Sequence, residues 1–142
     1  MLKIFVDSDV ILDYFFNREP YSINSSRLFS LAKENKFRIY VTPVIIAKVY
    51  YILRQTAHDE KVRAHIFELL TFVDIIDIQK GIISKALKSD FKDFEDAIQN
   101  YACEAKIDIK FILTRNIKDY KNSKKSVLTP QEFLNNFKNY IS

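Results

Sequence analysis

Glycine is nearly absent from this 142-residue chain, in which Gly81 is the single example. Loops that cradle phosphate groups use several glycines, because residues without a side chain let the backbone turn tightly and approach the phosphate. Neither a GxGxxG pattern nor a GxxxxGK pattern occurs. The sequence therefore argues against dinucleotide binding and against P-loop nucleotide binding.

Cysteine and histidine are also scarce. Because Cys103 is the single cysteine, no disulfide can form within the chain, and we expect a reducing, cytoplasmic location. With only His58 and His65, and no CxxC or HExxH pattern, a zinc site is not expected. No apolar run approaches the roughly 20 residues of a membrane span, and the first residues do not read as a signal peptide. We expect no membrane association.

The composition predicts a folded domain with a modest basic excess. Hydrophobic residues make up 48% and charged residues 28% of the chain, so residues 1–142 can form one domain with a buried core. The net charge is +4. Residues 106–125 hold seven basic and two acidic side chains. This segment is either a solvated lysine-rich loop or a surface that contacts the phosphates of a polyanionic partner.

Short apolar segments of strand type alternate with segments of helical periodicity. Strands are predicted at 2–6, 37–41, 73–76, 109–113 and 126–128, and helices at 9–17, 20–35, 43–56, 59–70, 79–88, 93–106 and from 130. Thr42-Pro43 and Asp93 each predict a helix start, and Thr129-Pro130 with Glu132 forms a capping box. The alternation predicts an α/β fold of three α/β/α layers, with a central parallel sheet of four to five strands.

Acidic side chains follow two of the predicted strands. Asp7 ends the first strand, and Asp119 lies shortly after the 109–113 strand. Asp96 lies in the first turn of the helix that leads into the 109–113 strand. Ligands of parallel sheets bind at the carboxyl ends of the strands, so these carboxylates converge if the two strands are neighbours. Oxygen ligands alone suit Mg²⁺ or Mn²⁺, which can activate water for phosphodiester hydrolysis.

Simpler interpretations of the three carboxylates stay open. Asp7 can cap the turn that follows it, Asp96 can serve as an acid favoured by the helix dipole, and Asp119 can be an ordinary loop residue. We favour function for Asp7. The sequence does not decide for Asp96, and the loop interpretation is slightly favoured for Asp119.

Other polar residues near these positions have two interpretations each. Asp9, Asp13, Asp93 and Glu95 are expected to be caps or surface groups rather than ligands. Thr114 and Asn116 can stabilise a turn or hold metal-bound water. Arg115 can contact phosphate or remain solvated.

Five segments together resemble a known family. They are DSDVILDYFFNREP (7–20), TPVIIAKVYYILR (42–54), DFEDAIQNYA (93–102), TRNIKDY (114–120) and LTPQEF (128–133). In this order and spacing they resemble the PIN domain family, in its VapC-like toxin branch, over nearly the whole chain. The resemblance implies a ribonuclease that depends on Mg²⁺ or Mn²⁺. It also implies a toxin that forms homodimers and is silenced by an antitoxin protein.

The resemblance also implies which residues form the site. The first acidic position of the family falls on Asp7, and the acidic position at the start of the late helix falls on Asp96. The last acidic region falls on TRNIKDY, where Asn116 occupies a commonly acidic place and Asp119 remains acidic. The catalytic and metal-binding residues implied are therefore Asp7, Asp96 and Asp119.

Lys48 departs from the family pattern. The family often has a glutamate after the alanine of this helix, but here the pair is Ala47-Lys48. A charged lysine cannot bind a metal ion. It can pair with Asp7 or Asp96 and leave a catalytically degenerate module that binds RNA or protein. Alternatively, it can contact substrate phosphate beside a metal held by three carboxylates, or extend into solvent. A signalling receiver domain also clusters aspartates at strand ends, but the TRNIKDY segment has no role in one.

Overall fold

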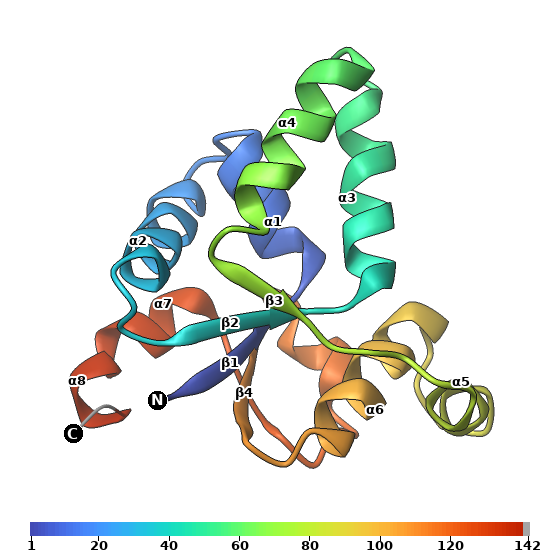
Figure 1. Ribbon diagram of the computed structural model, residues 1–142. Coiled ribbons are helices and arrows are strands. Elements are labelled where there is room, and N and C mark those ends of the chain that lie inside the picture. The colour runs from blue at the N-terminus through green and yellow to red at the C-terminus, as the bar shows by residue number, and fades with distance from the viewer. Residues whose placement is uncertain (141–142) are drawn as a thin grey trace.

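A five-stranded parallel sheet runs through the centre of the computed structural model (Figure 1), which describes residues 1–140. The strand order is β3-β2-β1-β4-β5, and every neighbouring pair is parallel. The strands are β1 (Lys3–Val6), β2 (Arg38–Val41), β3 (Val73–Ile75), β4 (Ile109–Leu113) and β5 (Ser126–Leu128). The parallel sheet and all five strand positions are as predicted. Of the predicted domain 1–142, residues 141 and 142 lie outside the described part.

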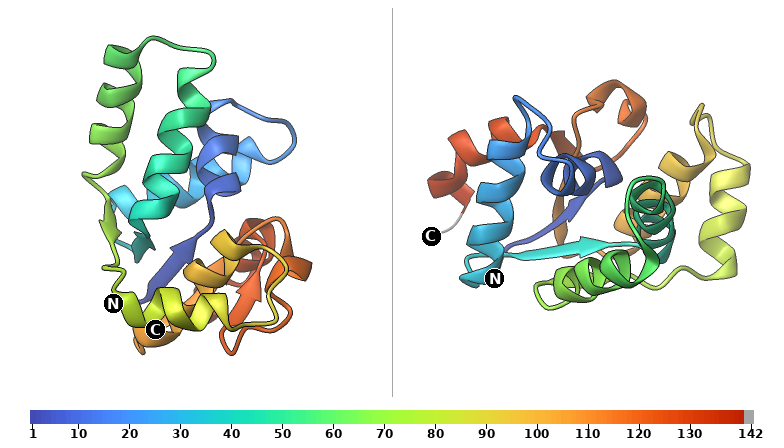
Figure 2. Two further views of the ribbon diagram at one scale, coloured as in Figure 1. Left: turned by 90° about the vertical axis from the view of Figure 1, so that its right-hand side faces the viewer. Right: turned by 90° about the horizontal axis from the view of Figure 1, so that it is seen from above.

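Helices cover both faces of this sheet and complete the predicted three layers (Figures 1 and 2). The first face carries α1 (Ser8–Phe15), α2 (Ser22–Lys33), α3 (Pro43–Arg54) and α4 (Asp59–Leu69). The opposite face carries α5 (Lys80–Leu87) and α6 (Phe94–Ala105). The chain then forms a 3-10 helix, η1 (Ile117–Tyr120), and ends with α7 (Pro130–Asn135), which packs against α2, and α8 (Phe137–Tyr140). Within residues 1–140, no helix combines the length and the apolar character needed to cross a membrane.

The strands form because both of their faces are covered. Ile4, Phe5 and Val6 of β1 are fully buried, as expected for a central strand between two helical layers. The same core takes up Cys103, which is a free and buried thiol. β1 is therefore the central strand of the sheet, and its carboxyl end lies at the middle of the sheet edge.

The predicted helix starts are confirmed by their capping hydrogen bonds. Thr42 Oγ1 accepts from the backbone N–H of Ile45 at 3.2 Å, and Asp93 Oδ1 accepts from the N–H of Asp96 at 3.0 Å. Thr129 and Glu132 form the complete capping box. These bonds satisfy backbone donors that an uncapped helix would leave without partners.

Several predicted boundaries differ from the observed ones by one or two residues, and the second helix is shorter at both ends. The second helix begins at Ser22 rather than Pro20, and it ends at Lys33, just before Asn35 adopts a positive φ of 61°. Asparagine tolerates this left-handed conformation better than most residues, and it stops a helix. The four residues of η1 are too few to show a helical periodicity, so the sequence gives no sign of them.

Candidate active site

The carboxyl edge of the sheet brings together residues that are more than 100 positions apart. Val6 of β1 pairs with Leu113 of β4, and the Asp7 N–H donates to the Leu113 carbonyl at 3.0 Å. The next residue of each strand, Asp7 and Thr114, therefore lie side by side at the edge. The condition stated for convergence, that these two strands are neighbours, is met.

Asp7 is a buried carboxylate that is held by three donors. Its Oδ1 accepts from the Ser8 N–H at 2.8 Å, and its Oδ2 accepts from Thr114 Oγ1 and from Tyr120 Oη, both at 3.2 Å. Burial raises the pKa of Asp7, and these three bonds and the charge of Lys48 offset part of that effect. Asp7 caps α1 as well, so the capping interpretation is confirmed, while its role as a metal ligand stays a prediction.

Asp9 is neither a cap nor a surface group, and that prediction is wrong. Its Oδ2 accepts from Thr114 Oγ1 at 3.2 Å, from the Arg115 N–H at 3.0 Å and from Asn116 Nδ2 at 3.3 Å. Its Oδ1 is buried and has no hydrogen-bond partner among residues 1–140. Burial, and then the charge of Asp7, raise the pKa of Asp9 to about 6.

The residues after β4 support this arrangement. A hydroxyl has a single hydrogen, so Thr114 can donate to Asp7 or to Asp9, but not to both at once. The Asn116 side-chain amide donates to Asp9, and the Asn116 backbone N–H donates to Thr114 Oγ1 at 3.1 Å. The turn-stabilising interpretation therefore applies to both Thr114 and Asn116.

Asp96 lies in the same electrostatic environment, at the start of α6. Burial, and then the negative charges of Asp7, Asp93 and Asp119, raise the pKa of Asp96 to about 7 against the opposing charge of Lys48. The charges of Asp7 and Asp119 therefore both act on Asp96, although no group of three acidic, histidine or cysteine side chains within residues 1–140 is arranged to hold a metal ion. The three-residue ligand set stays a prediction.

Lys48 reaches this edge from α3, but it pairs with neither Asp7 nor Asp96. Its Nζ lies 3.5 Å from Glu95 Oε2, and the Lys48 side chain is 42% exposed. Thr42 Oγ1 donates to Gln99 Oε1 at 2.5 Å, which ties the start of α3 to α6 and keeps this lysine near the acidic residues. The positive charge of Lys48 offsets part of the rise in the pKa of both Asp7 and Asp96.

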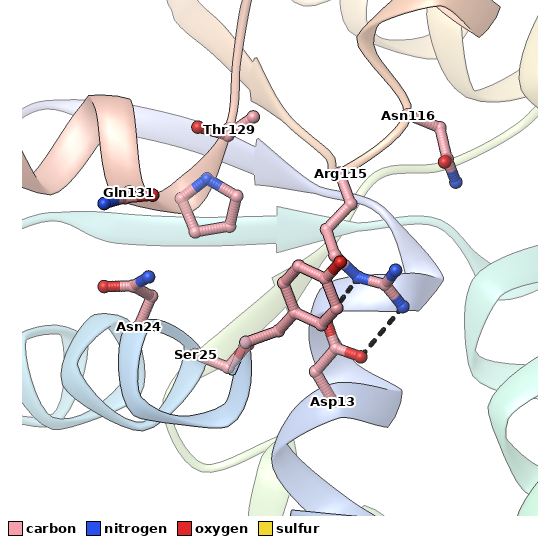
Figure 3. Close-up of a pocket in the computed structure, with 9 residues that line it drawn as sticks. Asp13, Asn24, Ser25, Arg115, Asn116, Thr129 and Gln131 are labelled. Atoms are coloured by element: carbon pink, nitrogen blue, oxygen red, sulfur yellow. Dashed lines mark hydrogen bonds and ion pairs between the residues drawn. The ribbon is translucent and has the colours of Figure 1, made fainter. Parts of the chain in front are cut away.

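Arg115 forms an ion pair with the buried Asp13, and the prediction that Asp13 is a cap or a surface group was wrong (Figure 3). Asp13 is 1% exposed, and it accepts from Arg115 Nε at 2.7 Å and from Arg115 Nη2 at 3.0 Å. A carboxylate with so little access to water needs a partner, and the Arg115 guanidinium supplies it. Contact of Arg115 with phosphate stays a prediction. Asp13 lies three positions after the buried Val10 on α1, and this spacing is the one sequence signal of its burial.

The basic segment 106–125 divides into structural and exposed side chains. Lys125 Nζ donates to the carbonyls of Ile109 at 2.8 Å, Lys106 at 3.3 Å and Ile107 at 3.4 Å, and therefore secures the entry to β4. Four lysines of this segment are exposed and can contact phosphate, as one of the two interpretations predicts: Lys110, Lys118, Lys121 and Lys124.

The chemistry of this edge fits a hard divalent cation. Every candidate ligand atom is an oxygen. Burial raises the pKa of Asp7, Asp9 and Asp96, and the negative charge of Asp7 raises the pKa of Asp9 and Asp96 further. Asp9 Oδ1 is in addition a buried oxygen that lacks a partner among the described residues. A cation would relieve both conditions, and oxygen-only sites favour Mg²⁺ or Mn²⁺.

Comparisons with known proteins agree with this arrangement. A family model described as PIN domain matches residues 3–118. Ribonuclease VapC1 of Aquifex aeolicus is 32% identical over 136 residues, which cover 92% of each chain. Two solved structures share the fold at low identity. VapBC2 from Rickettsia felis, bound to a DNA fragment from its promoter, aligns with a TM-score of 0.65 at 16% identity, over 89% of this chain and 97% of that one. VapC20 of Mycobacterium tuberculosis, a toxin that cleaves the sarcin–ricin loop, aligns with a TM-score of 0.59 at 19% identity, over 77% and 86%.

Proposed function

The chain belongs to the PIN domain family, and we propose that it is an endoribonuclease that hydrolyses RNA phosphodiester bonds with Mg²⁺ or Mn²⁺. The observation that carries the proposal is the set of crowded carboxylates at the carboxyl edge of β1 and β4, in a chain 32% identical to a VapC ribonuclease. We propose further that it is the toxin of a toxin–antitoxin pair, that residues 1–142 are one PIN-like domain and that it acts in the cytoplasm.

Asp7, Asp96 and Asp119 would hold the metal in this proposal, with Asp9 close enough to Asp7 to share its field. When bound, the metal would activate a water molecule and neutralise charge on the phosphate. The chain itself orients the carboxylates. Ser8, Thr114 and Tyr120 fix Asp7 by hydrogen bonds, and the Asp93 cap fixes the first turn of α6 that carries Asp96.

RNA cleavage tests the proposal directly. Purified protein should cut RNA in the presence of Mn²⁺ or Mg²⁺, and EDTA should stop the reaction. Asp7→Asn should remove the activity, because it takes a negative charge from the buried edge while keeping the shape of the side chain. Glu60→Gln is the matched control, since Glu60 is exposed in the first turn of α4, the end of that helix that lies away from the sheet (Figure 1). Cutting that survives in Asp7→Asn, or a broad set of RNAs left intact with both metals, would refute the proposal.

A second candidate function rests on Lys48. A lysine paired with Glu95 keeps a positive charge at the acidic edge and lowers the pKa of Asp7 and Asp96. A charge of this kind can partly replace a metal, which would leave a degenerate PIN-like module that binds RNA or protein without cutting it. RNA binding that is independent of metal, together with absent cleavage, would favour this second function.

The proposed protein partners are an antitoxin and a second copy of the chain. The structural relatives include a toxin–antitoxin complex from Klebsiella pneumoniae, with a TM-score of 0.66 at 17% identity, over 89% of this chain and 97% of that one. Production of the chain alone should arrest growth of its host, and a small protein encoded beside it should restore growth. Exposed apolar residues on α3 and α4 support the homodimer, with Tyr51 and Leu70 exposed and Phe67 75% exposed. Monomeric mass in light scattering at all concentrations would refute the dimer.

A further inference from the structure

A polar pocket lies beside the acidic edge, between α1, α2, α7 and the segment that follows β4 (Figure 3). Its volume is about 230 Å³, which is below the roughly 300–1,000 Å³ of clefts that hold drug-sized ligands. Asn116 connects the two places, because it lines the pocket and also donates to Asp9. Asp9 in turn shares the Thr114 hydroxyl with Asp7. A ligand that reaches the acidic edge therefore has this pocket next to it.

One wall of the pocket is a flat platform. The Arg115 guanidinium lies 4.1 Å over the centre of the Tyr21 ring, and its two bonds to Asp13 hold it in place. Those bonds use two of the five N–H donors of a guanidinium. Arg115 is 25% exposed and Tyr21 is 42% exposed, so both keep surface that a ligand can cover. Nucleobases stack on arginine and tyrosine planes of this kind.

The opposite side of the pocket carries hydrogen-bonding groups. Asn24 of α2 and Gln131 of α7 lie on the same side, across from Arg115 (Figure 3). Each of these amides offers both a donor and an acceptor. Ser25 also lines the pocket; it is fully buried, and its Oγ has no hydrogen-bond partner among residues 1–140. A buried hydroxyl without a partner is unfavourable, and a polar ligand would satisfy it.

We propose that this pocket binds one nucleobase of the RNA strand, from a nucleotide next to the scissile phosphate, and that Asn24 and Gln131 set the base preference. This inference rests on the proposed ribonuclease function. A base supplies both a flat ring for the platform and an edge of donors and acceptors for the amides. An apolar side chain from a protein partner would leave Ser25 and both amides unpaired, and a basic side chain would meet the charge of Arg115.

Cleavage of a short RNA set that varies one position at a time tests the preference. The wild type should favour certain bases at one position beside the cut, by roughly 5- to 150-fold, as expected for discrimination by hydrogen bonds to a base edge. Asn24→Ala or Gln131→Ala should reduce that preference several-fold, toward equal cutting of all bases. Gln55→Ala is the matched control, because Gln55 is exposed at the outer end of α3 and should leave the preference unchanged. Equal cutting of all bases by the wild type, or an unchanged preference in both pocket variants, would overturn the proposal.

A second measurement separates this proposal from the ribonuclease function. The four ribonucleoside 5′-monophosphates are titrated into the wild type, and the side-chain amide signals of Asn24 and Gln131 are followed by NMR. Base-dependent shifts of these signals support the pocket even if the protein cuts no RNA. Cutting without any such shift at millimolar nucleotide keeps the ribonuclease function and overturns the pocket. Loss of binding to a protein partner in Asn24→Ala, with base preference unchanged, would assign the pocket to that partner and overturn the proposal.

Discussion

Removing Asp13 from its ion pair with Arg115 should destabilise the protein more than breaking an exposed ion pair does. Asp13 is 1% exposed, and two hydrogen bonds of 2.7 and 3.0 Å join it to the guanidinium. Removing one member of a buried pair typically costs about 3–5 kcal/mol, because the other charge stays buried without compensation. After Asp13→Ala, however, Arg115 keeps its contact with Tyr21 and some access to water. We therefore expect the low end of that range, about 3 kcal/mol.

Urea unfolding of the wild type and of Asp13→Ala measures this quantity. In a parallel thermal unfolding experiment, a loss of about 3 kcal/mol should lower the thermal midpoint by roughly 10 °C in a chain of this size. The matched control is Asp74→Ala, which breaks the exposed pair of Asp74 with Arg38 at the sheet edge and should leave the midpoint near that of the wild type. The reasoning is refuted if Asp13→Ala is as stable as the wild type, or if both variants lose the same amount.

Three further predictions concern charge and assembly. The folded-state pKa values of Asp9, about 6, and of Asp96, about 7, lie above those of an unfolded chain, so the fold binds more protons between about pH 4 and 7. The urea midpoint in EDTA should therefore fall as pH rises through this window, and Asp96→Asn should flatten the fall; a rising midpoint would contradict the prediction. Lys48→Glu should increase Mn²⁺ affinity several-fold in calorimetry while Lys61→Glu on α4 does not, and equal affinities would remove Lys48 from the site. Phe67→Lys should shift the mass in light scattering toward the monomer, and an unchanged dimer would place the interface elsewhere.

Most of the fold was predictable because its signals are local. Apolar strands, capping residues such as Thr42 and Thr129, and helical spacing each depend on a few neighbouring residues, and the structure confirms them. The proximity of Asp7 and Thr114 was also predictable, because it follows from a general rule for the carboxyl ends of parallel strands once β1 and β4 are neighbours.

The supporting contacts of the site were not predictable in the same way. Arg115 meets Asp13 across 102 positions of sequence, and no local pattern says which of several acidic residues a given arginine will reach. Asp9 lies two residues after the capping residue Asp7, in the first turn of α1, where acidic residues are common. Its neighbours in sequence therefore gave no sign that it bonds the turn after β4. Lys48 and Glu95 are both exposed, and exposed charges show no preference for a partner until the helices that carry them are placed.

Direct titration of Mn²⁺ into the metal-free protein, without RNA, tests most directly whether the acidic edge holds a cation. The wild type should show a binding event in calorimetry that weakens strongly in Asp7→Asn and in Asp96→Asn. The event should persist in Glu60→Gln, which removes an exposed carboxylate far from the edge. Mn²⁺ binding that is absent from the wild type, or that is equally strong in Asp7→Asn and Asp96→Asn, would contradict the account.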